Sequence, residues 1–96
     1  MTKYNQLLTL IRKAEVQARY ACGKTLCQNK INEGLIPPPL KLGSRGVAFF
    51  ESEINATLAV TIAGYTDEQI KQFVRDLVAK RKDLLKQYTH LEAAND

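Results

Sequence analysis

Three consecutive prolines, Pro37-Pro38-Pro39, are the feature that most restricts how this chain can fold. Proline has no backbone N–H to donate, and it biases the residue before it away from helical angles. A helix therefore cannot pass through this run, and the backbone there must be extended. Helical patterns before and after the prolines have to be separate elements.

Two short helices are predicted before the prolines. A helical pattern of apolar and polar residues runs from Lys13 to about Tyr20, and a second runs from about Lys24 to Glu33. Gly34 stands where a glycine commonly caps a helix C-terminus. The connection, Ala21-Cys22-Gly23, is short and contains a glycine, which is typical of a helix-turn-helix. Residues 3–11 fit either a frayed helix or a short strand.

A β-hairpin is predicted directly after the prolines. The short apolar runs Leu40-Lys41-Leu42 and Val47-Ala48-Phe49-Phe50 flank Gly43-Ser44-Arg45-Gly46. Two such runs around a four-residue loop bounded by glycines are typical of a hairpin. A helix-turn-helix followed by a hairpin predicts a winged helix-turn-helix, a mainly α fold with a small β-hairpin wing.

A further helix is predicted to begin at Glu51-Ser52-Glu53, where two acids suit a helix N-terminus and the Ser52 hydroxyl can cap it. Its apolar stripe is expected to contain Ile54, Leu58 and Ile62, and its end is expected near Gly64. The two acids also resemble a carboxylate pair, but residues two apart do not share a helix face. We therefore assign them to the helix start and expect no catalytic site.

The last and longest helix is predicted from Thr66-Asp67-Glu68 to about Tyr88 or Leu91. Its apolar residues recur at spacings of three and four, with Arg81 as the one interruption. Such a helix either folds back over its own domain or joins a second copy of the chain. The residues predicted for self-association as a homodimer are Ile70, Val74, Leu77, Leu84 and Tyr88. The predicted domain organisation is 1–65 for the winged helix-turn-helix, 66–92 for the terminal amphipathic helix and 93–96 for a tail.

The charge is distributed unevenly along the chain. Residues 1–50 hold eight bases and two acids, a balance of +6, whereas residues 51–96 hold six bases and eight acids, a balance of −2. A positive front half predicts a face that meets a polyanion. The longest uncharged apolar run, residues 56–65, is far shorter than the roughly 20 residues of a membrane span. No secretory signal is visible, so we expect a cytoplasmic protein without membrane contact.

Few residues suit metal or redox chemistry. The chain has two cysteines, Cys22 and Cys27, and one histidine, His90. These three do not make the four-ligand set of a structural zinc site, so we expect two reduced core cysteines and a solvated histidine. Nothing pairs a nucleophile with a base, and neither enzymatic activity nor a cofactor is predicted.

The predicted recognition helix and wing carry the candidate DNA-binding residues. Leu26, Cys27 and Ile31 are expected to pack inward. Amide side chains suit adenine edges, lysines suit guanine or phosphate, and a wing-tip arginine suits a narrow minor groove. The predicted double-stranded-DNA-binding residues are Lys24, Thr25, Gln28, Asn29, Lys30, Asn32, Lys41, Ser44 and Arg45.

About residues 10 to 64 resemble the AlpA-type prophage regulators, small winged helix-turn-helix proteins related to phage excisionases and more distantly to the DNA-binding domains of MerR-type regulators. The most specific part of the resemblance is the stretch from Gly34 to Arg45. The chain departs from the pattern at Ala21, where the family usually has glycine, and at Phe49 and Thr57, where tryptophans are frequent. The Tyr-Arg pair common in the recognition helix is Gln28-Asn29 here, which implies a different target sequence.

The resemblance implies a transcriptional regulator of a prophage or other mobile element. An excision factor that bends attachment-site DNA is the alternative, and an integrase or RNA polymerase would be a natural further partner. A protein-interaction adaptor that uses the winged helix and the long helix is the alternative from another class.

Overall fold

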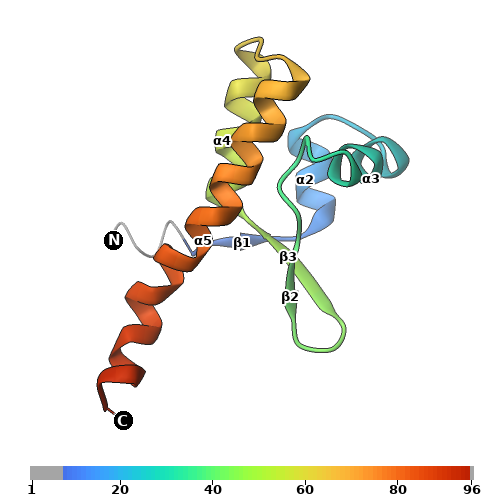
Figure 1. The fold of residues 1–96 in the computed structure, drawn as a ribbon. Coiled ribbons are helices and arrows are strands. Elements are labelled where there is room, and N and C mark those ends of the chain that lie inside the picture. The colour runs from blue at the N-terminus through green and yellow to red at the C-terminus, as the bar shows by residue number, and fades with distance from the viewer. Residues whose placement is uncertain (1–7, 96) are drawn as a thin grey trace.

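The computed structural model describes residues 8–95 of the chain, with side chains for residues 8–89. A helix-turn-helix comes first, a β-hairpin wing follows, and two antiparallel helices complete the fold (Figure 1). The predicted fold class is therefore confirmed. The elements in chain order are β1 (Leu10–Ile11), α2 (Lys13–Arg19), α3 (Lys24–Asn32), β2 (Leu40–Leu42), β3 (Gly46–Phe50), α4 (Glu51–Ile62) and α5 (Asp67–Asn95).

The wing is part of a three-stranded antiparallel sheet in the order β1-β3-β2. Leu10 lies opposite Phe50, and Leu40 lies opposite Ala48. Residues directly opposite each other in an antiparallel pair share a sheet face, and neighbours along a strand alternate between faces. One face therefore carries Ile11, Lys41, Val47 and Phe49, and the other carries Leu10, Leu40, Leu42, Ala48 and Phe50.

The first sheet face packs on the helix-turn-helix through Phe49, which is 1% exposed. Phe49 belongs to a fully buried cluster that takes one side chain from each of the flanking elements. Its other members are Val16 of α2, Cys27 of α3, Ile36 before the prolines and Ile54 of α4. This core therefore holds α3 and the wing in a fixed relation to each other.

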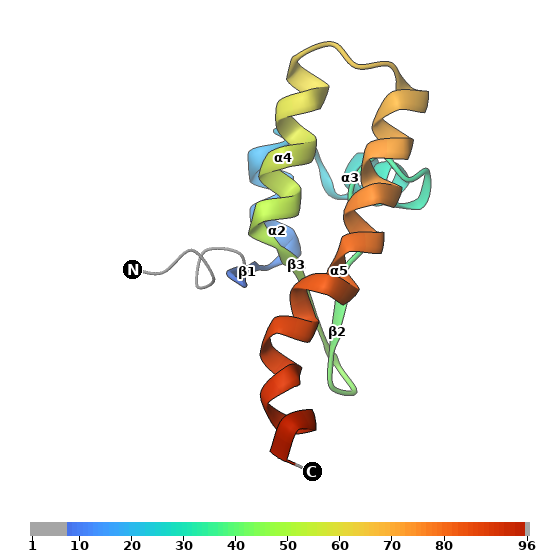
Figure 2. The ribbon, with the colours of Figure 1, turned by 60° about the vertical axis from the view of Figure 1, so that its left-hand side comes forward.

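A second apolar cluster fastens α5 to the domain. Leu35, Ile70 and Val74 are buried together, with Val60 and Val78 packed against them. These α5 residues all belong to its N-terminal half, and the helix runs antiparallel beside α4 in both ribbon views (Figures 1 and 2). The C-terminal half continues past the body of the domain, at the end from which the wing also projects.

Arg81, the interruption in the apolar pattern of α5, makes the polar contacts that fasten the middle of this helix. Its guanidinium donates to both carboxylate oxygens of Glu53, at 2.8 Å and 2.6 Å, and to the Pro38 carbonyl at 2.8 Å. It also lies over the Phe50 ring, 5.7 Å from the centroid. One side chain thus joins α5 to the start of α4 and to the proline run.

Two details of α4 differ from the sequence prediction. Ser52 does not cap the helix, because α4 already begins at Glu51 and the Glu51 N–H donates to the Thr9 carbonyl at 2.9 Å, extending the sheet. Ile62 is 78% exposed, so the predicted stripe is wrong at its last member. Val60 faces α5, and a residue two positions further is rotated by about 200° around the helix.

The start of α5 agrees with the prediction, and its end does not. The Gln69 N–H donates to the Thr66 hydroxyl at 3.2 Å, and the Thr66 N–H donates to the Gln69 side chain at 2.9 Å, which is a capping box. The helix extends to Asn95, past the end predicted near Tyr88 or Leu91. None of the helices in the described part of the chain combines the length and the apolar character required to cross a bilayer.

We predict that Arg81→Ala lowers the free energy of unfolding by about 3 kcal/mol, because it leaves the buried Glu53 carboxylate without its partner. Glu53 and Arg81 side chains are only 7% and 14% exposed, so water cannot replace the lost hydrogen bonds. Urea unfolding followed by circular dichroism measures the change. The control is Arg75→Ala, an exposed arginine of the same helix, for which we expect less than about 0.5 kcal/mol. Equal effects of the two substitutions would contradict the role of Arg81.

Candidate nucleic-acid interface

The turn between α2 and α3 is a tight helix stop built on an alanine. Ala21 has φ of +52°, the left-handed region that glycine normally occupies. The Ala21 N–H donates to the Ala18 carbonyl and the Cys22 N–H to the Gln17 carbonyl, both at 3.1 Å. The chain then enters α3 directly after Gly23. The turn thus ends α2 and lets α3 start in a new direction. Its left-handed residue, Ala21, is strained because it carries a Cβ.

The α3 helix presents a polar outward face. Cys27 is 0% exposed and Ile31 packs against the same core, so this side of the helix faces inward, as predicted. Lys30 is partly buried, and the other predicted contact residues of α3 are exposed. These exposed residues are Lys24, Thr25, Gln28, Asn29 and Asn32.

Leu26 was predicted to pack inward, and that prediction is wrong, because its side chain is 51% exposed. An α-helix turns by about 100° per residue, so the residue next to the inward Cys27 lies on the flank of the helix. Leu26 consequently stands on the outward surface of α3, beside Thr25. An apolar side chain there can contact a thymine methyl group.

A chain of hydrogen bonds orients the Gln28 side chain. The Lys13 ammonium donates to the Gln28 Oε1 atom, and the Gln28 Nε2 atom donates to Asn32 Oδ1 at 2.9 Å. The side chains of α2 and α3 therefore share one polar surface. Lys13 could not be predicted from the sequence as part of this surface. It lies 15 positions before Gln28, and the two side chains meet only because α2 packs against α3.

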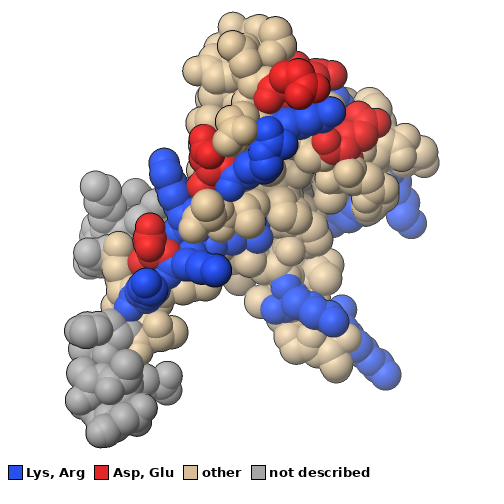
Figure 3. Space-filling view, in the orientation of Figure 1, with Lys and Arg blue, Asp and Glu red and all other residues tan. Residues whose placement is uncertain are grey.

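The wing supplies a second polar and basic surface. Lys41, Ser44 and Arg45 are all exposed, and Arg45 lies in the turn between the glycines at positions 43 and 46. Figure 3 shows the basic side chains of the wing projecting below the body of the domain. Residues 40–50 contain no acid, so no carboxylate within the wing offsets these charges.

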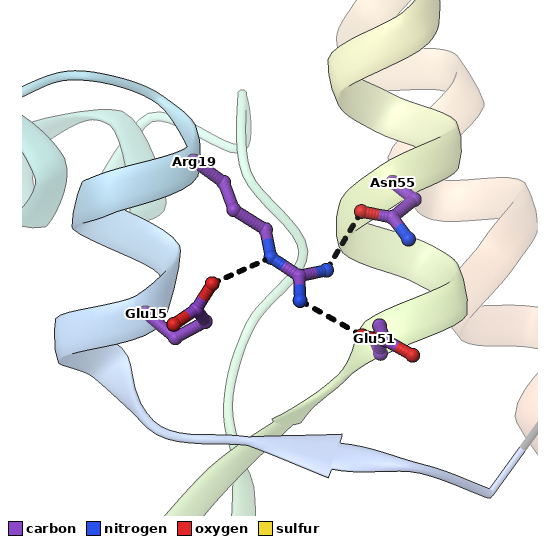
Figure 4. Close-up of polar contacts among 4 residues, drawn as sticks. All are labelled: Glu15, Arg19, Glu51 and Asn55. Atoms are coloured by element: carbon purple, nitrogen blue, oxygen red, sulfur yellow. Dashed lines mark hydrogen bonds and ion pairs between the residues drawn. The ribbon is translucent and has the colours of Figure 1, made fainter.

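Arg19 contributes to the positive charge of the front half, yet it makes internal contacts. Its guanidinium donates to Glu15 at 3.0 Å, to Glu51 at 2.8 Å and to Asn55 at 2.9 Å (Figure 4). The hydrogen bonds to Glu51 and then Glu15 raise the pKa of the Arg19 side chain. It therefore joins α2 to α4. The basic residues predicted for the candidate interface, Lys24, Lys30, Lys41 and Arg45, are accompanied there by Lys13.

The two cysteines are free thiols, and Cys27 is a core residue. Burial, followed by the neighbouring Cys22, raises the pKa of the Cys27 thiol, which keeps it protonated and unreactive. Among the residues the structure describes, no three His, Cys, Asp or Glu side chains gather as metal ligands. The side chain of His90 lies outside the described ones.

Part of the chain matches the model of a known protein family. A family model described as "Prophage CP4-57 regulatory protein (AlpA)" matches residues 9–59, from the start of the sheet to most of α4. The match includes all of α2, α3 and the wing, and it ends before α5. Neither the curated proteins nor the solved structures contain a significant match to the chain.

We predict that Ala21→Gly stabilises the protein by about 0.5–1 kcal/mol, because glycine adopts the left-handed conformation without a Cβ clash. The matched control is Gly34→Ala, which places a Cβ at a φ of +82° after α3. That Cβ would lie 3.8 Å from its nearest neighbour, Lys71 Cγ, which is ordinary van der Waals contact. We therefore expect Gly34→Ala to lower the free energy of unfolding by about 1 kcal/mol, because alanine is strained at this φ and not because it clashes. Thermal unfolding measures both. A lower melting temperature for Ala21→Gly would contradict the strained turn.

Proposed function

The chain belongs to the AlpA family of prophage regulatory proteins, and from this premise we propose that it regulates a prophage or another mobile element by binding double-stranded DNA. The residues of the winged helix-turn-helix make the contacts. The protein performs no chemical step in this proposal and acts by occupying and bending operator or attachment-site DNA.

One observation supports this proposal most directly. Two described arginines, Arg19 and Arg81, use their side chains in ion pairs within the domain and are not counted in the candidate interface. The exposed polar residues of α3 and of the wing are amides, hydroxyls, lysines and an arginine, and Leu26, Leu42 and Val47 are exposed beside them. These polar groups are the ones that bond base edges and phosphates. Phe49 in the common core keeps the two surfaces in a fixed relation.

In this proposal α3 lies in the major groove. The amide side chains of Gln28 and Asn29 bond base edges, with adenine as the best-matched base, and Lys24 bonds guanine or phosphate. The Lys13 contact holds the Gln28 amide in one orientation before DNA arrives, which lowers the entropy lost on binding. Leu26 adds an apolar contact to a thymine methyl.

The wing lies on the adjacent minor groove or backbone. Arg45 is placed in a turn bounded by glycines, whose backbone can approach DNA closely because they lack a Cβ. Its guanidinium is attracted by the concentrated negative potential of a narrow A·T-rich minor groove. Lys41 on β2 bonds phosphate, which carries no sequence information.

The same DNA-binding face serves either a regulator of transcription, with RNA polymerase as the further partner, or an excision factor, with an integrase as the partner. The family description favours regulation. A search of the genomic neighbourhood separates the two, because an adjacent integrase gene favours excision. The adaptor alternative requires no DNA contact at all, so any sequence-selective DNA binding counts against it.

We predict specific binding to DNA that flanks the protein's own coding locus, measured by fluorescence anisotropy between 50 and 300 mM salt. If Lys24, Lys30, Lys41 and Arg45 each neutralise one phosphate, log affinity falls against log salt with a slope of about −4 per protomer. A slope near zero, or no binding to any duplex, would contradict the proposed function.

We predict different effects for the two basic wing residues. Arg45→Ala weakens binding and reduces the preference for A·T pairs next to the site, whereas Lys41→Ala weakens binding about equally on all sequences. Selection from DNA with randomised flanks measures both effects. The control is Arg75→Ala, an exposed arginine of the N-terminal half of α5, which is expected to leave affinity and preference unchanged. An unaltered flank preference in the Arg45 variant would show that Arg45 does not read the minor groove.

A further inference from the structure

The sheet has a second apolar face that the helix-turn-helix core does not cover. The β1–β3 and β2–β3 registers place Leu10, Leu40, Leu42, Ala48 and Phe50 on it, opposite the face of Phe49. We call these five residues the leucine face. Leu10 is 40% exposed and Leu42 is 49% exposed. An antiparallel sheet that packs on one side usually carries polar residues on the other, so this face departs from the ordinary pattern.

The α5 helix covers this face only in part. A groove of about 350 Å³ runs between them and is lined by Leu10, Leu40, Lys41, Leu42, Phe50 and Leu85, among others. A second groove of about 250 Å³ lies on the α4 side of the same helix and includes Phe50, Leu77 and Leu84. Phe50 is common to both, so the two grooves flank the middle and C-terminal part of α5.

The exposed part of α5 carries apolar side chains as well. Leu85 is 41% exposed and Tyr88 is 37% exposed. Leu85 lines the same groove as the leucine face, so its apolar side chain is continuous with that face. The backbones of the wing and of this part of α5 project at the same end of the domain (Figures 1 and 2). Contiguous apolar surface of this kind marks an interaction site.

We propose that this surface binds a second copy of the chain, with the C-terminal half of each α5 lying in the partner's groove against its leucine face. The groove and the helix that would fill it lie side by side on one protomer. A two-fold axis near Leu85 therefore brings each helix to the other protomer's groove, which is the self-complementary arrangement of a cyclic dimer.

The proposal changes which residues make the predicted self-association contact. Ile70 and Val74 are 5% and 4% exposed inside their own protomer, so they are not available to a partner. Leu77, Leu84 and Tyr88 remain from the predicted stripe. The proposed contact adds three residues to this set, Leu10, Leu42 and Leu85. It is a contact of a helix with a sheet, and not the helix–helix contact that the sequence predicted.

The size of the surface suits a weak dimer. The three strands have two, three and five residues, so at about 3.4 Å per residue and about 4.8 Å spacing they cover about 160 Å². The C-terminal half of α5, about 10 Å wide and roughly 20 Å long, adds about 200 Å². Two such patches give about 700 Å², which is typical of weak, transient interfaces, and we expect a dimer that forms at micromolar concentrations.

Sedimentation equilibrium of the full-length chain between about 1 and 200 μM tests the proposal. Wild-type protein is expected to reach twice the monomer mass within this range. Leu85→Glu and, separately, Leu42→Glu are expected to remain monomeric with unchanged circular dichroism, because both side chains are on the surface. Ile62→Glu is the matched control, an exposed apolar residue of α4 outside the patch, and it is expected to dimerise like the wild type. A monomeric wild type, or a dimeric Leu85→Glu, would overturn the proposal.

A mixture of two variants tests the reciprocal contact. Leu85→Lys and Leu42→Glu are each expected to be monomeric alone. Mixed in equal amounts they are expected to form a heterodimer. At one contact the lysine introduced at position 85 of the first variant meets the glutamate introduced at position 42 of the second. At the other contact the unchanged Leu42 of the first variant meets the unchanged Leu85 of the second. Failure of the mixture to associate, with both variants folded, would show that the two positions do not meet across a two-fold axis.

The consequence for DNA rests on the proposed function, and its failure can be told from failure of the dimer. A dimer presents two copies of α3 to two half-sites, so monomeric Leu85→Glu is expected to bind a two-half-site duplex at least about tenfold more weakly than wild type. Binding of both proteins to a single half-site is expected to be equal. If the wild type is a dimer and yet binds the two-half-site duplex no more tightly than Leu85→Glu does, the two-half-site arrangement is rejected and the dimer itself is not. A wild type that dimerises but binds no DNA would reject the proposed function and leave the dimer intact.

Discussion

The alternation of side chains along β3 is the constraint on which the rest of the structure depends. Phe49 points into the helix-turn-helix core, and Phe50, one residue later, points to the opposite side and lies beneath the Arg81 guanidinium. Because successive strand residues face opposite sides, a single strand joins two packing layers. The first layer fixes the wing relative to α3, and the second fixes α5 relative to the wing. Pro38 and Glu53 complete the second layer by accepting the hydrogen bonds of Arg81.

The features that local sequence determines could be predicted. Both helices of the helix-turn-helix and both strands of the wing were predicted near their observed positions. The prediction used the proline run, the glycine-bounded turn and the cap at Gly34, which are signals carried by residues close together in the chain. The family resemblance was confirmed over residues 9–59. The roles of Arg19 and Arg81 could not be predicted, because their partners lie 32 and 28 residues away. The apolar pattern predicted that Leu26 and Ile62 face the core, and both are exposed. Which side of a helix is buried depends on the element that packs against it, and the local sequence does not specify that element.

The candidate DNA-binding surface and the proposed dimer surface share the same small sheet and meet at Lys41. By register Lys41 belongs to the first sheet face, but it also lines the groove beside the leucine face, to which Leu40 and Leu42 belong. The family match ends at residue 59, so α5 lies outside the matched region and covers part of this second face. In the proposed dimer, α5 and this second face make the contact between the two copies of the chain.

The central claim is that α3 and the wing tip form one DNA-binding surface. Backbone amide chemical shifts of the isotope-labelled chain, followed by NMR during titration with its flanking DNA, test this claim most directly. The account predicts that the largest changes occur at Lys24–Asn32 and at residues 41–46, with small changes along the exposed side of α5. Changes concentrated on α5, with α3 and the wing turn unaffected, would contradict it.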